Sequence, residues 1–203
     1  MEEASSLIFG NSIGASFLYK KDVFFRNRGY DENLHSVEDY DFWLRSTIHS
    51  NFYHIRDSLY NFRSHYASLS SKLSIENTPE NKLFTKKLKK CYQNYFEKLR
   101  YNHAERYSEL FTRIHQYREF DVLSFIQNYL DFEMLLKKIG EYSDVFEFEE
   151  LVKDSDIRLR ANIQEYKKNQ NLTVLIQLLL RRPSLLLRYD KKNSLKIIRK
   201  CLK

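Results

Sequence analysis

Apolar residues are spaced differently in the first third of the chain and in the rest. Residues 7–19 are mainly apolar and small, which is typical of a buried strand, and residues 51–63 alternate well enough to predict one or two further strands. Between them, residues 20–28 predict a short helix ending at Gly29, and residues 38–48 carry apolar side chains at helical spacing. The first third therefore predicts a mixed α/β lobe.

From Pro79 onward the spacing is helical almost everywhere. Pro79 fits the first turn of a helix, and apolar residues recur every three or four positions to about Arg118, which predicts one or two long helices. Asp121 is expected to cap a further helix that ends at Gly140. Shorter helices are expected at about 144–153, 156–169, 172–181 and 184–201.

Turn-forming residues are also distributed unevenly. Three of the four glycines lie in the first third, whereas the residues after Pro79 are almost free of turn formers. We therefore expect an α+β protein that is mostly α. Its first domain, residues 1–76, would be a lobe of few strands and two short helices, and its second, residues 80–203, an all-α extension.

The net charge of +7 is concentrated at one end of the chain. Residues 172–203 carry nine Lys or Arg against Asp190 alone, a net charge of +8, so the other 171 residues sum to −1. This basic tail also contains leucine runs, a combination typical of helices that lie on an anionic membrane surface. A core-facing helix with a solvated basic face is the alternative. Nucleic acid is not expected as a partner, because aromatic and basic residues are segregated in the tail.

Cysteine usage and hydropathy indicate the compartment. Cys91 and Cys201 are far apart and lack the spacing of a zinc site or a disulfide framework. The longest apolar run, residues 172–180, is far too short to cross a bilayer, and no signal peptide is expected. We expect a cytoplasmic protein, peripheral at the inner face of the membrane if the tail binds lipid. Whether the chain also forms an oligomer through its helices stays open.

The most informative local pattern is a cluster of carboxylates at the start of a predicted helix. Glu38, Asp39 and Asp41 lie within four positions and precede Phe42-Trp43-Leu44-Arg45. Acidic residues in a first turn also stabilise a helix dipole, so decoration of the helix terminus is the simple alternative to an active site. Three further blocks flank this cluster: Gly14-Ala15-Ser16-Phe17-Leu18-Tyr19, then Arg28-Gly29-Tyr30-Asp31-Glu32-Asn33-Leu34, and finally Tyr60-Asn61-Phe62-Arg63-Ser64-His65-Tyr66-Ala67-Ser68.

In this order and at this spacing, the four blocks resemble the acceptor-side half of an inverting, GT-A-type family 2 glycosyltransferase. The resemblance covers roughly residues 7–73. In that family the small-residue block lines the sugar pocket, the Gly-Tyr-Asp-Glu turn leads to the acidic pair, and the ED-x-D-x-W-L-R pattern opens the helix with the catalytic base. Asn27-Arg28-Gly29-Tyr30 replaces the usual double glycine, which leaves one glycine for the turn.

The resemblance implies roles for the carboxylates. Asp39 matches the general base that removes the acceptor hydroxyl proton, and the neighbouring charges of Glu38 and Asp41 would raise its pKa. Glu38 and Asp41 would contact substrate. For Glu38, a salt bridge to Arg45 or Arg63 is the alternative.

The block after the helix implies further contacts. Arg63 would pair with the leaving diphosphate, Ser68 would contact substrate, and His65 would ligate the divalent metal together with a DxD motif from elsewhere. A surface position is the alternative for His65. Trp43 would stack on a sugar ring or, as we expect, pack in the core.

The family also implies parts that this sequence does not supply. A complete enzyme begins with a Rossmann-like half that binds the nucleotide and ends in a DxD metal motif, and residues 1–13 are too few for that fold. Two DxD triplets occur, at residues 39–41 and 154–156. The first lies in a predicted helix, where positions two apart diverge, and the second is expected to be a helix N-cap.

We therefore expect a portion of a glycosyltransferase that is inactive alone. The complete enzyme would transfer a sugar from a nucleotide-sugar donor to a saccharide or lipid-linked acceptor with inversion. It would use Mn²⁺ or Mg²⁺, and no cofactor is expected for this chain by itself. The alternative is a non-catalytic helical module for protein interaction or membrane-surface binding, with residues 80–203 as the functional part. An upstream reading frame that encodes a strand-rich half with a DxD motif would favour the enzyme.

Overall fold

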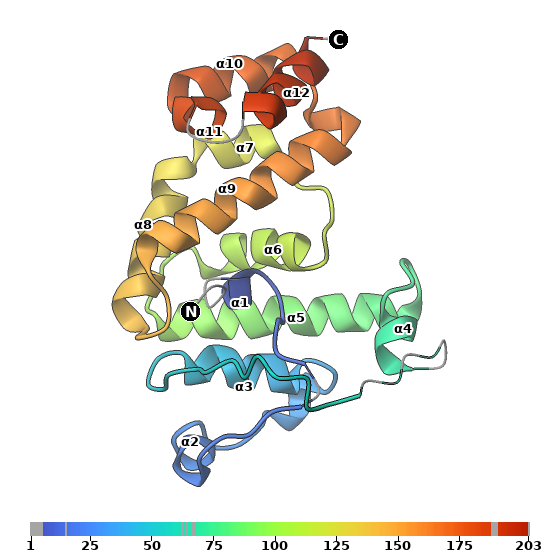
Figure 1. Cartoon of the computed structure of the whole chain (residues 1–203), viewed down its shortest axis with the longest axis vertical. Helices are drawn as coiled ribbons and strands as arrows, with labels where there is room; N and C mark the ends of the chain where they lie inside the picture. The colour runs from blue at the N-terminus through green and yellow to red at the C-terminus, as the bar shows by residue number, and fades with distance from the viewer. Residues whose placement is uncertain are drawn as a thin grey trace.

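The computed structural model describes residues 6–14, 16–61, 63, 65, 68–187 and 191–202, apart from the side chain of Leu187. Helices account for 66% of the structure, and the described residues include no strand. The prediction of an α+β fold with a partial GT-A lobe is therefore wrong, because the described part of the chain is all-α. Figure 1 shows the helices stacked along the long axis, with the first third at one end and the C-terminal helices at the other.

The first third contains short helices joined by irregular segments. The predicted strand at residues 7–19 is replaced by α1 and an irregular segment, and residues 51–61 are irregular. A strand needs a hydrogen-bonded neighbour, and the described residues supply none for either segment. The helices of this region are α1 (Ser6–Phe9), α2 (Lys21–Arg26), the 3₁₀ helix η1 (Glu32–Leu34), α3 (Glu38–Ser46) and α4 (Leu69–Leu73).

Two predicted helices in this region are confirmed. The helix expected at residues 20–28 is α2, and Gly29 beyond it has a φ of +71°, a conformation that glycine adopts without strain. A Cβ atom at Gly29 would lie 3.0 Å from the Phe24 ring, so the position also needs a small residue. The helix expected at residues 38–48 is α3, which begins with the acidic cluster.

The helical extension begins as predicted. Pro79 occupies the first turn, and Thr78 caps the helix by accepting a hydrogen bond from the Asn81 backbone N–H at 3.1 Å. Where one or two long helices are expected up to about Arg118, the structure has two, α5 and α6. The elements of the extension are α5 (Pro79–Lys98), α6 (Ala104–His115), α7 (Val122–Gln127), α8 (Tyr129–Tyr142), α9 (Phe148–Glu165), η2 (Lys167–Asn169), α10 (Leu172–Arg181), α11 (Pro183–Leu187) and α12 (Lys191–Cys201).

Gly140 does not end its helix as expected. Asp121 does cap α7, accepting from the Ser124 N–H at 3.0 Å, but the helical run breaks at Asn128. The following helix, α8, runs through Gly140 to Tyr142. A Cβ atom at Gly140 would lie 3.4 Å from the Phe146 carbonyl oxygen, so this glycine permits a close approach of the next loop.

The triplet Asp154-Ser155-Asp156 is not a helix N-cap. It lies in the middle of α9, which runs unbroken from Phe148 to Glu165. Ser155 donates to the Val152 carbonyl at 2.7 Å, inside the helix, and Asp156 pairs with Arg182 at 2.6 Å. The tertiary ion pair explains why a buried acidic residue is tolerated within the helix.

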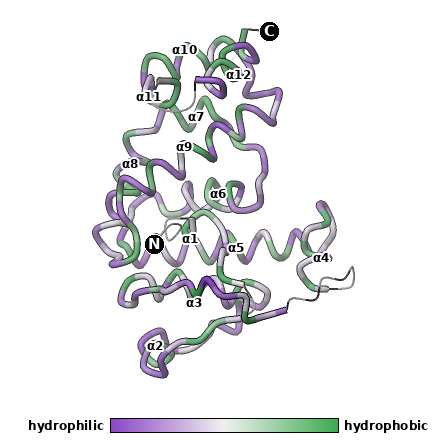
Figure 2. The backbone as a smooth tube through the Cα atoms, in the orientation of Figure 1, coloured by the Kyte–Doolittle hydropathy of each residue, from purple (hydrophilic) through white to green (hydrophobic). Residues whose placement is uncertain are grey.

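One buried core extends from the first third into the extension. Aromatic and aliphatic side chains of α1 and α3 belong to the same cluster as those of α5 to α12. The Ser143 hydroxyl donates to the Thr47 carbonyl at 2.8 Å and so joins the loop after α8 to the end of α3. Figure 2 shows hydrophobic and hydrophilic residues alternating along α5 and α9, as expected for helices with one buried face. The division into domains at residues 76–80 stays a prediction.

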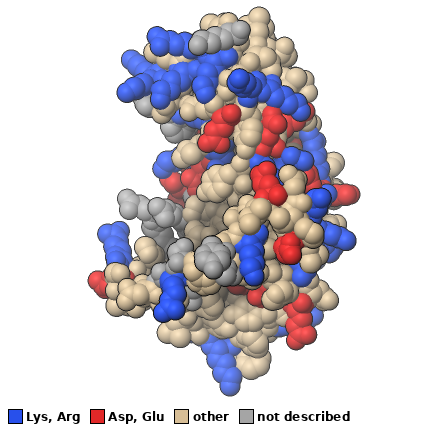
Figure 3. All heavy atoms as spheres, turned by 90° about the vertical axis from the view of Figure 1, so that its right-hand side faces the viewer, with Lys and Arg blue, Asp and Glu red and all other residues tan. Residues whose placement is uncertain are grey.

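The basic tail forms three short helices, α10 to α12, at one end of the molecule. Figure 3 shows Lys and Arg side chains gathered over this end. In the part of the chain that the structure describes, no helix combines the length and the apolar character that crossing a membrane requires.

Candidate functional site

An open pocket lies at the N-terminal end of α3. Its volume is about 410 Å³. The side chains around it are carboxylates and aromatic rings from the irregular segment before α2, from η1 and the loops on either side of it, and from the first turn of α3. They are Phe17, Tyr30, Asp31, Glu32, His35, Glu38 and Asp39. The pocket therefore contains the predicted catalytic base and one predicted substrate-binding carboxylate.

Asp39 is half-buried at the edge of this pocket. Its Oδ2 accepts a hydrogen bond from Asn11 Nδ2 at 3.2 Å, and its Oδ1 accepts from the Tyr40 N–H at 2.7 Å. Burial raises the pKa of Asp39 above 3.8, and the charge of Glu38 raises it further, against the lowering effect of the two hydrogen bonds. The direction agrees with the prediction, but burial rather than neighbouring charge contributes most. A carboxylate held in this way is suited to accept a proton.

Glu38 lies beside Asp39 in the first turn of α3. Its Oε2 atom is buried and has no hydrogen-bond partner among the described residues. The alternative of a salt bridge to Arg45 is not supported, because Arg45 pairs with Asp41 instead. Glu38 thus lines the pocket and keeps one buried acceptor oxygen without a partner among the described residues.

Asp41 does not join the pocket. It is 3% exposed and forms an ion pair with Arg45 at 2.6 Å. Arg45 also donates to the carbonyl oxygens of Asn27 and Gly29, the latter at 3.0 Å. This pair holds α3 against the turn that follows α2, and the predicted contact of Asp41 with substrate stays a prediction for a residue that does not line the pocket. Burial raises the pKa of Asp41, and the Arg45 guanidinium opposes that shift.

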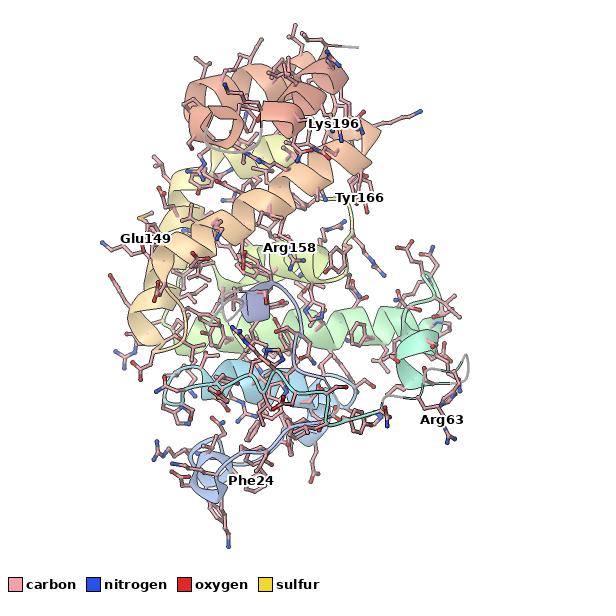
Figure 4. All side chains as sticks on the ribbon, in the orientation of Figure 1. Phe24, Arg63, Glu149, Arg158, Tyr166 and Lys196 are labelled. Carbon is pink, nitrogen blue, oxygen red and sulfur yellow. The ribbon has the colours of Figure 1, made fainter. Side chains whose placement is uncertain are left out.

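Arg63, His65 and Ser68 are not among the residues that line the pocket. Figure 4 shows Arg63 beside α4, on the other side of the molecule from Phe24. Arg63 and His65 are exposed, whereas Ser68 is the N-cap of α4 and accepts from the Ser71 N–H at 3.2 Å. The structure therefore brings none of the three predicted residues to Asp39.

The residues present do not fit a divalent metal. Within the described ranges, no three His, Cys, Asp or Glu side chains gather closely enough to hold an ion. His65 stands apart from the carboxylates of α3, and the side chains of Asp39 and Asp41 have separate partners. His65 is expected to bind a metal only together with a DxD motif from elsewhere, so its role stays a prediction.

Aromatic rings form one wall of the pocket and the layer behind it. Phe17 is 44% exposed and contacts the Trp43 ring edge-on, at 4.7 Å between centroids. Trp43 is 4% exposed, so the expected core position agrees with the structure. The Tyr30 hydroxyl lies 3.1 Å from that of Tyr19, and burial raises the pKa of Tyr30. Phe17 and Tyr30 belong to the blocks that flank the acidic cluster, but their spacing does not predict that they border the pocket.

Sequence reasoning also missed a buried polar network behind α3. The Tyr40 hydroxyl donates to the Leu7 carbonyl at 2.8 Å and lies 2.8 Å from the Tyr92 hydroxyl, which in turn lies 3.1 Å from His115 Nδ1. Burial lowers the pKa of His115 to about 4, so the imidazole is neutral at pH 7. The network joins α1, α3, α5 and α6, and its members are too far apart in sequence to be paired by motif.

A second pocket of about 290 Å³ lies between α6 and α9. Arg158 places its guanidinium 5.2 Å from the centre of the Tyr117 ring there. It contains none of the predicted site residues, so the pocket at α3 is the better candidate.

Comparison with models of known families gives no match to this chain, and comparison with curated proteins and with solved structures gives none. The assignment of function therefore rests on the sequence pattern and on the geometry of the α3 pocket.

Proposed function

We propose that this chain is the acceptor-binding portion of an inverting glycosyltransferase, with Asp39 as its general base. The observation that carries the proposal is the pocket at the start of α3, which places a half-buried carboxylate of raised pKa beside a second carboxylate and two aromatic rings. This is the chemistry that a sugar hydroxyl requires, and it occurs at the residues on which the sequence resemblance rests.

The proposed reaction uses the pocket as follows. The Asp39 carboxylate takes the proton of an acceptor hydroxyl while the hydroxyl oxygen attacks the anomeric carbon of a nucleotide sugar. A new C–O bond forms, the bond from the anomeric carbon to the diphosphate breaks, and its electron pair leaves with the nucleoside diphosphate. Attack opposite the leaving group inverts the configuration. Glu38 would accept hydrogen bonds from other acceptor hydroxyls.

The aromatic wall supports a sugar as the ligand. The apolar face of a pyranose packs against flat rings, and Phe17 and Tyr30 border the same pocket as the two carboxylates. Because Phe17 is already 44% exposed, a bound ring would cover it without displacing core residues.

We propose further that turnover requires a nucleotide-binding half. The irregular segments on either side of α3 leave large apolar side chains in solvent, among them Leu18 at 99%, Tyr53 at 89% and Leu59 at 74% exposure. We propose that another polypeptide covers these side chains. The metal and the diphosphate contacts of the reaction would then come from that half.

Sugar binding by the chain as it stands tests the acceptor pocket. We expect saturation-transfer NMR with a panel of methyl pyranosides to show contacts for at least one sugar. Phe17→Ala should remove the signal, and Glu38→Gln should weaken it, because glutamine keeps one acceptor oxygen but loses the negative charge. Glu141→Gln and Phe25→Ala are matched controls, since both side chains are exposed and lie outside the pocket. Absence of contacts for every sugar in the panel would contradict the proposal.

Calorimetry tests the need for a second half. Nucleotide sugars should bind only weakly to this chain, with or without Mn²⁺. Micromolar affinity for any nucleotide sugar would show that the chain holds a donor site of its own and would overturn this part of the proposal.

A non-catalytic helical interaction module is the second candidate. It is favoured by Leu130 and Met134, which lie one turn apart on α8 and are 76% and 59% exposed. Under this alternative, a Leu130→Ser, Met134→Ser variant would lose a protein partner, whereas substitutions at Glu38 and Asp39 would change nothing measurable.

A further inference from the structure

The three C-terminal helices have an inner face that belongs to the core. Helix α10 packs on α7, and α12 packs on α9. The Arg182 guanidinium anchors the end of α10 by pairing with Asp156 at 2.6 Å and by stacking 3.9 Å from the centre of the Tyr129 ring. The buried side chains of the inner face are Val174, Leu175, Leu178, Leu185, Leu186 and Ile197. This face of the basic tail therefore packs in the core, and the choice between the two alternatives for the tail depends on its outer face.

The outer face of α10 is apolar, which is unusual for a helix on a surface. Leu172, Ile176, Leu179 and Leu180 are 55%, 44%, 51% and 73% exposed. Their spacing places all four on one side of the helix, opposite the buried residues. The sequence from Leu172 to Leu180 contains no charged residue, so the stripe is uninterrupted.

The outer face of α12 is basic. Lys196 and Arg199 are exposed and lie three positions apart, on the side opposite the buried Ile197. Leu195 and Leu202 border this face at 52% and 63% exposure. Helices α10 and α12 pack against each other, so the apolar stripe and the basic face belong to one end of the molecule (Figure 3).

We propose that α10 and α12 dock this end of the molecule on an anionic membrane surface. The apolar stripe of α10 enters the boundary between headgroups and acyl chains, and the basic side chains of α12 meet the lipid phosphates. The positive charge of the tail complements an anionic membrane and favours it over other partners. A second copy would bring two tails of net charge +8 together, and nucleic acid would leave the leucine stripe in water.

The geometry makes the association peripheral. A helix of ten residues, such as α10, is about 15 Å long, half of the hydrocarbon thickness of about 30 Å. Its inner face is also committed to the core, so only the outer side chains are available to lipid. The docked helix therefore lies in the plane of the surface.

Sedimentation with vesicles tests the proposal in the full chain. We expect binding to vesicles that contain phosphatidylserine, weakening steeply as salt rises, and no binding to pure phosphatidylcholine. Lys196→Gln with Arg199→Gln should weaken binding about 30-fold, since each basic residue contributes roughly a fivefold factor at such a surface. The matched control is Lys86→Gln with Lys90→Gln, an exposed pair on α5, which should bind as the unaltered chain does.

A second pair of variants tests the apolar stripe. Leu180→Ser should weaken vesicle binding about tenfold, because its side chain loses burial in lipid. Leu83→Ser on α5, at 54% exposure, should leave binding unchanged. Failure of the full chain to sediment with anionic vesicles at low salt would overturn the proposal, as would equal binding by the Lys196, Arg199 variant. A dimer seen by ultracentrifugation that Leu180→Ser dissociates, without vesicle binding, would assign the stripe to a second copy instead.

Discussion

Two aspartates on opposite sides of α3 differ in their surroundings. Asp39 faces the pocket, with Asn11 as its side-chain donor, whereas Asp41, two positions later, is 3% exposed and paired with Arg45. The helical rotation of about 200° between them separates the two carboxylates completely. Acidic residues that are neighbours in sequence therefore separate by helix face into a candidate for chemistry, Asp39, and a structural ion pair, Asp41 with Arg45.

Removal of the buried ion pair should have the largest effect on stability. Arg45→Met leaves the Asp41 carboxylate buried without its partner and takes a donor from the carbonyls of Asn27 and Gly29. We expect a loss of about 3–5 kcal/mol in the free energy of unfolding, measured by urea denaturation. Arg26→Met removes the exposed pair with Asp22 on α2 and should cost about 0–1 kcal/mol. An equal loss in the free energy of unfolding for the two variants would contradict the expected difference between a buried and an exposed ion pair.

The pH dependence of stability should report the network behind α3. The pKa of His115 is lowered to about 4 in the folded state, against 6.5 when unfolded. Its contribution to stability is therefore complete above pH 6.5 and lost as the pH falls toward 4, by roughly 3 kcal/mol. His115→Gln should flatten the stability profile in that window, whereas His103→Gln, at an exposed position, should not. An unchanged profile in the His115 variant would show that the imidazole titrates freely.

The smallest effect is expected for Asp39 itself. Because burial raises its pKa above 3.8, the folded state favours the protonated form, and stability falls as the pH rises through the raised pKa. Asp39→Asn removes that penalty, so the variant should be at least as stable as the unaltered chain at pH 7, with the difference vanishing below pH 3.8. A clear loss of stability at pH 7 would assign Asp39 a structural role like that of Asp41.

Local signals in the sequence predicted helices well. Gly29 marked the end of α2, the acidic first turn marked α3, and Pro79 marked the start of α5, because each signal acts within one helical turn. The predicted strands failed since alternation over a few residues does not supply a neighbouring strand. The N-cap expected at residues 154–156 failed because a distant partner, Arg182, stabilises Asp156 inside α9.

Of the residues that form the candidate site, the sequence predicts only the two carboxylates at the start of α3. The motif predicts Asp39 and Glu38, which line the pocket, and also Asp41, which does not, because the motif does not reveal which helix face is buried. The pair Asp41–Arg45 has the spacing of four that a helix brings together, and that signal was present in the sequence. The contact of Asn11 with Asp39 spans 28 positions, so only the fold reveals it.

Turnover by the chain combined with a nucleotide-binding half is the most direct test of Asp39 as the base. An upstream reading frame that encodes a strand-rich half with a DxD motif would supply the partner, and release of nucleoside diphosphate from a panel of nucleotide sugars gives the rate. We expect Asp39→Asn to lower the rate by about 10²–10⁴-fold with the fold intact, and Asp144→Asn, at an exposed position, to leave it unchanged. A near-normal rate in the Asp39 variant would contradict the account.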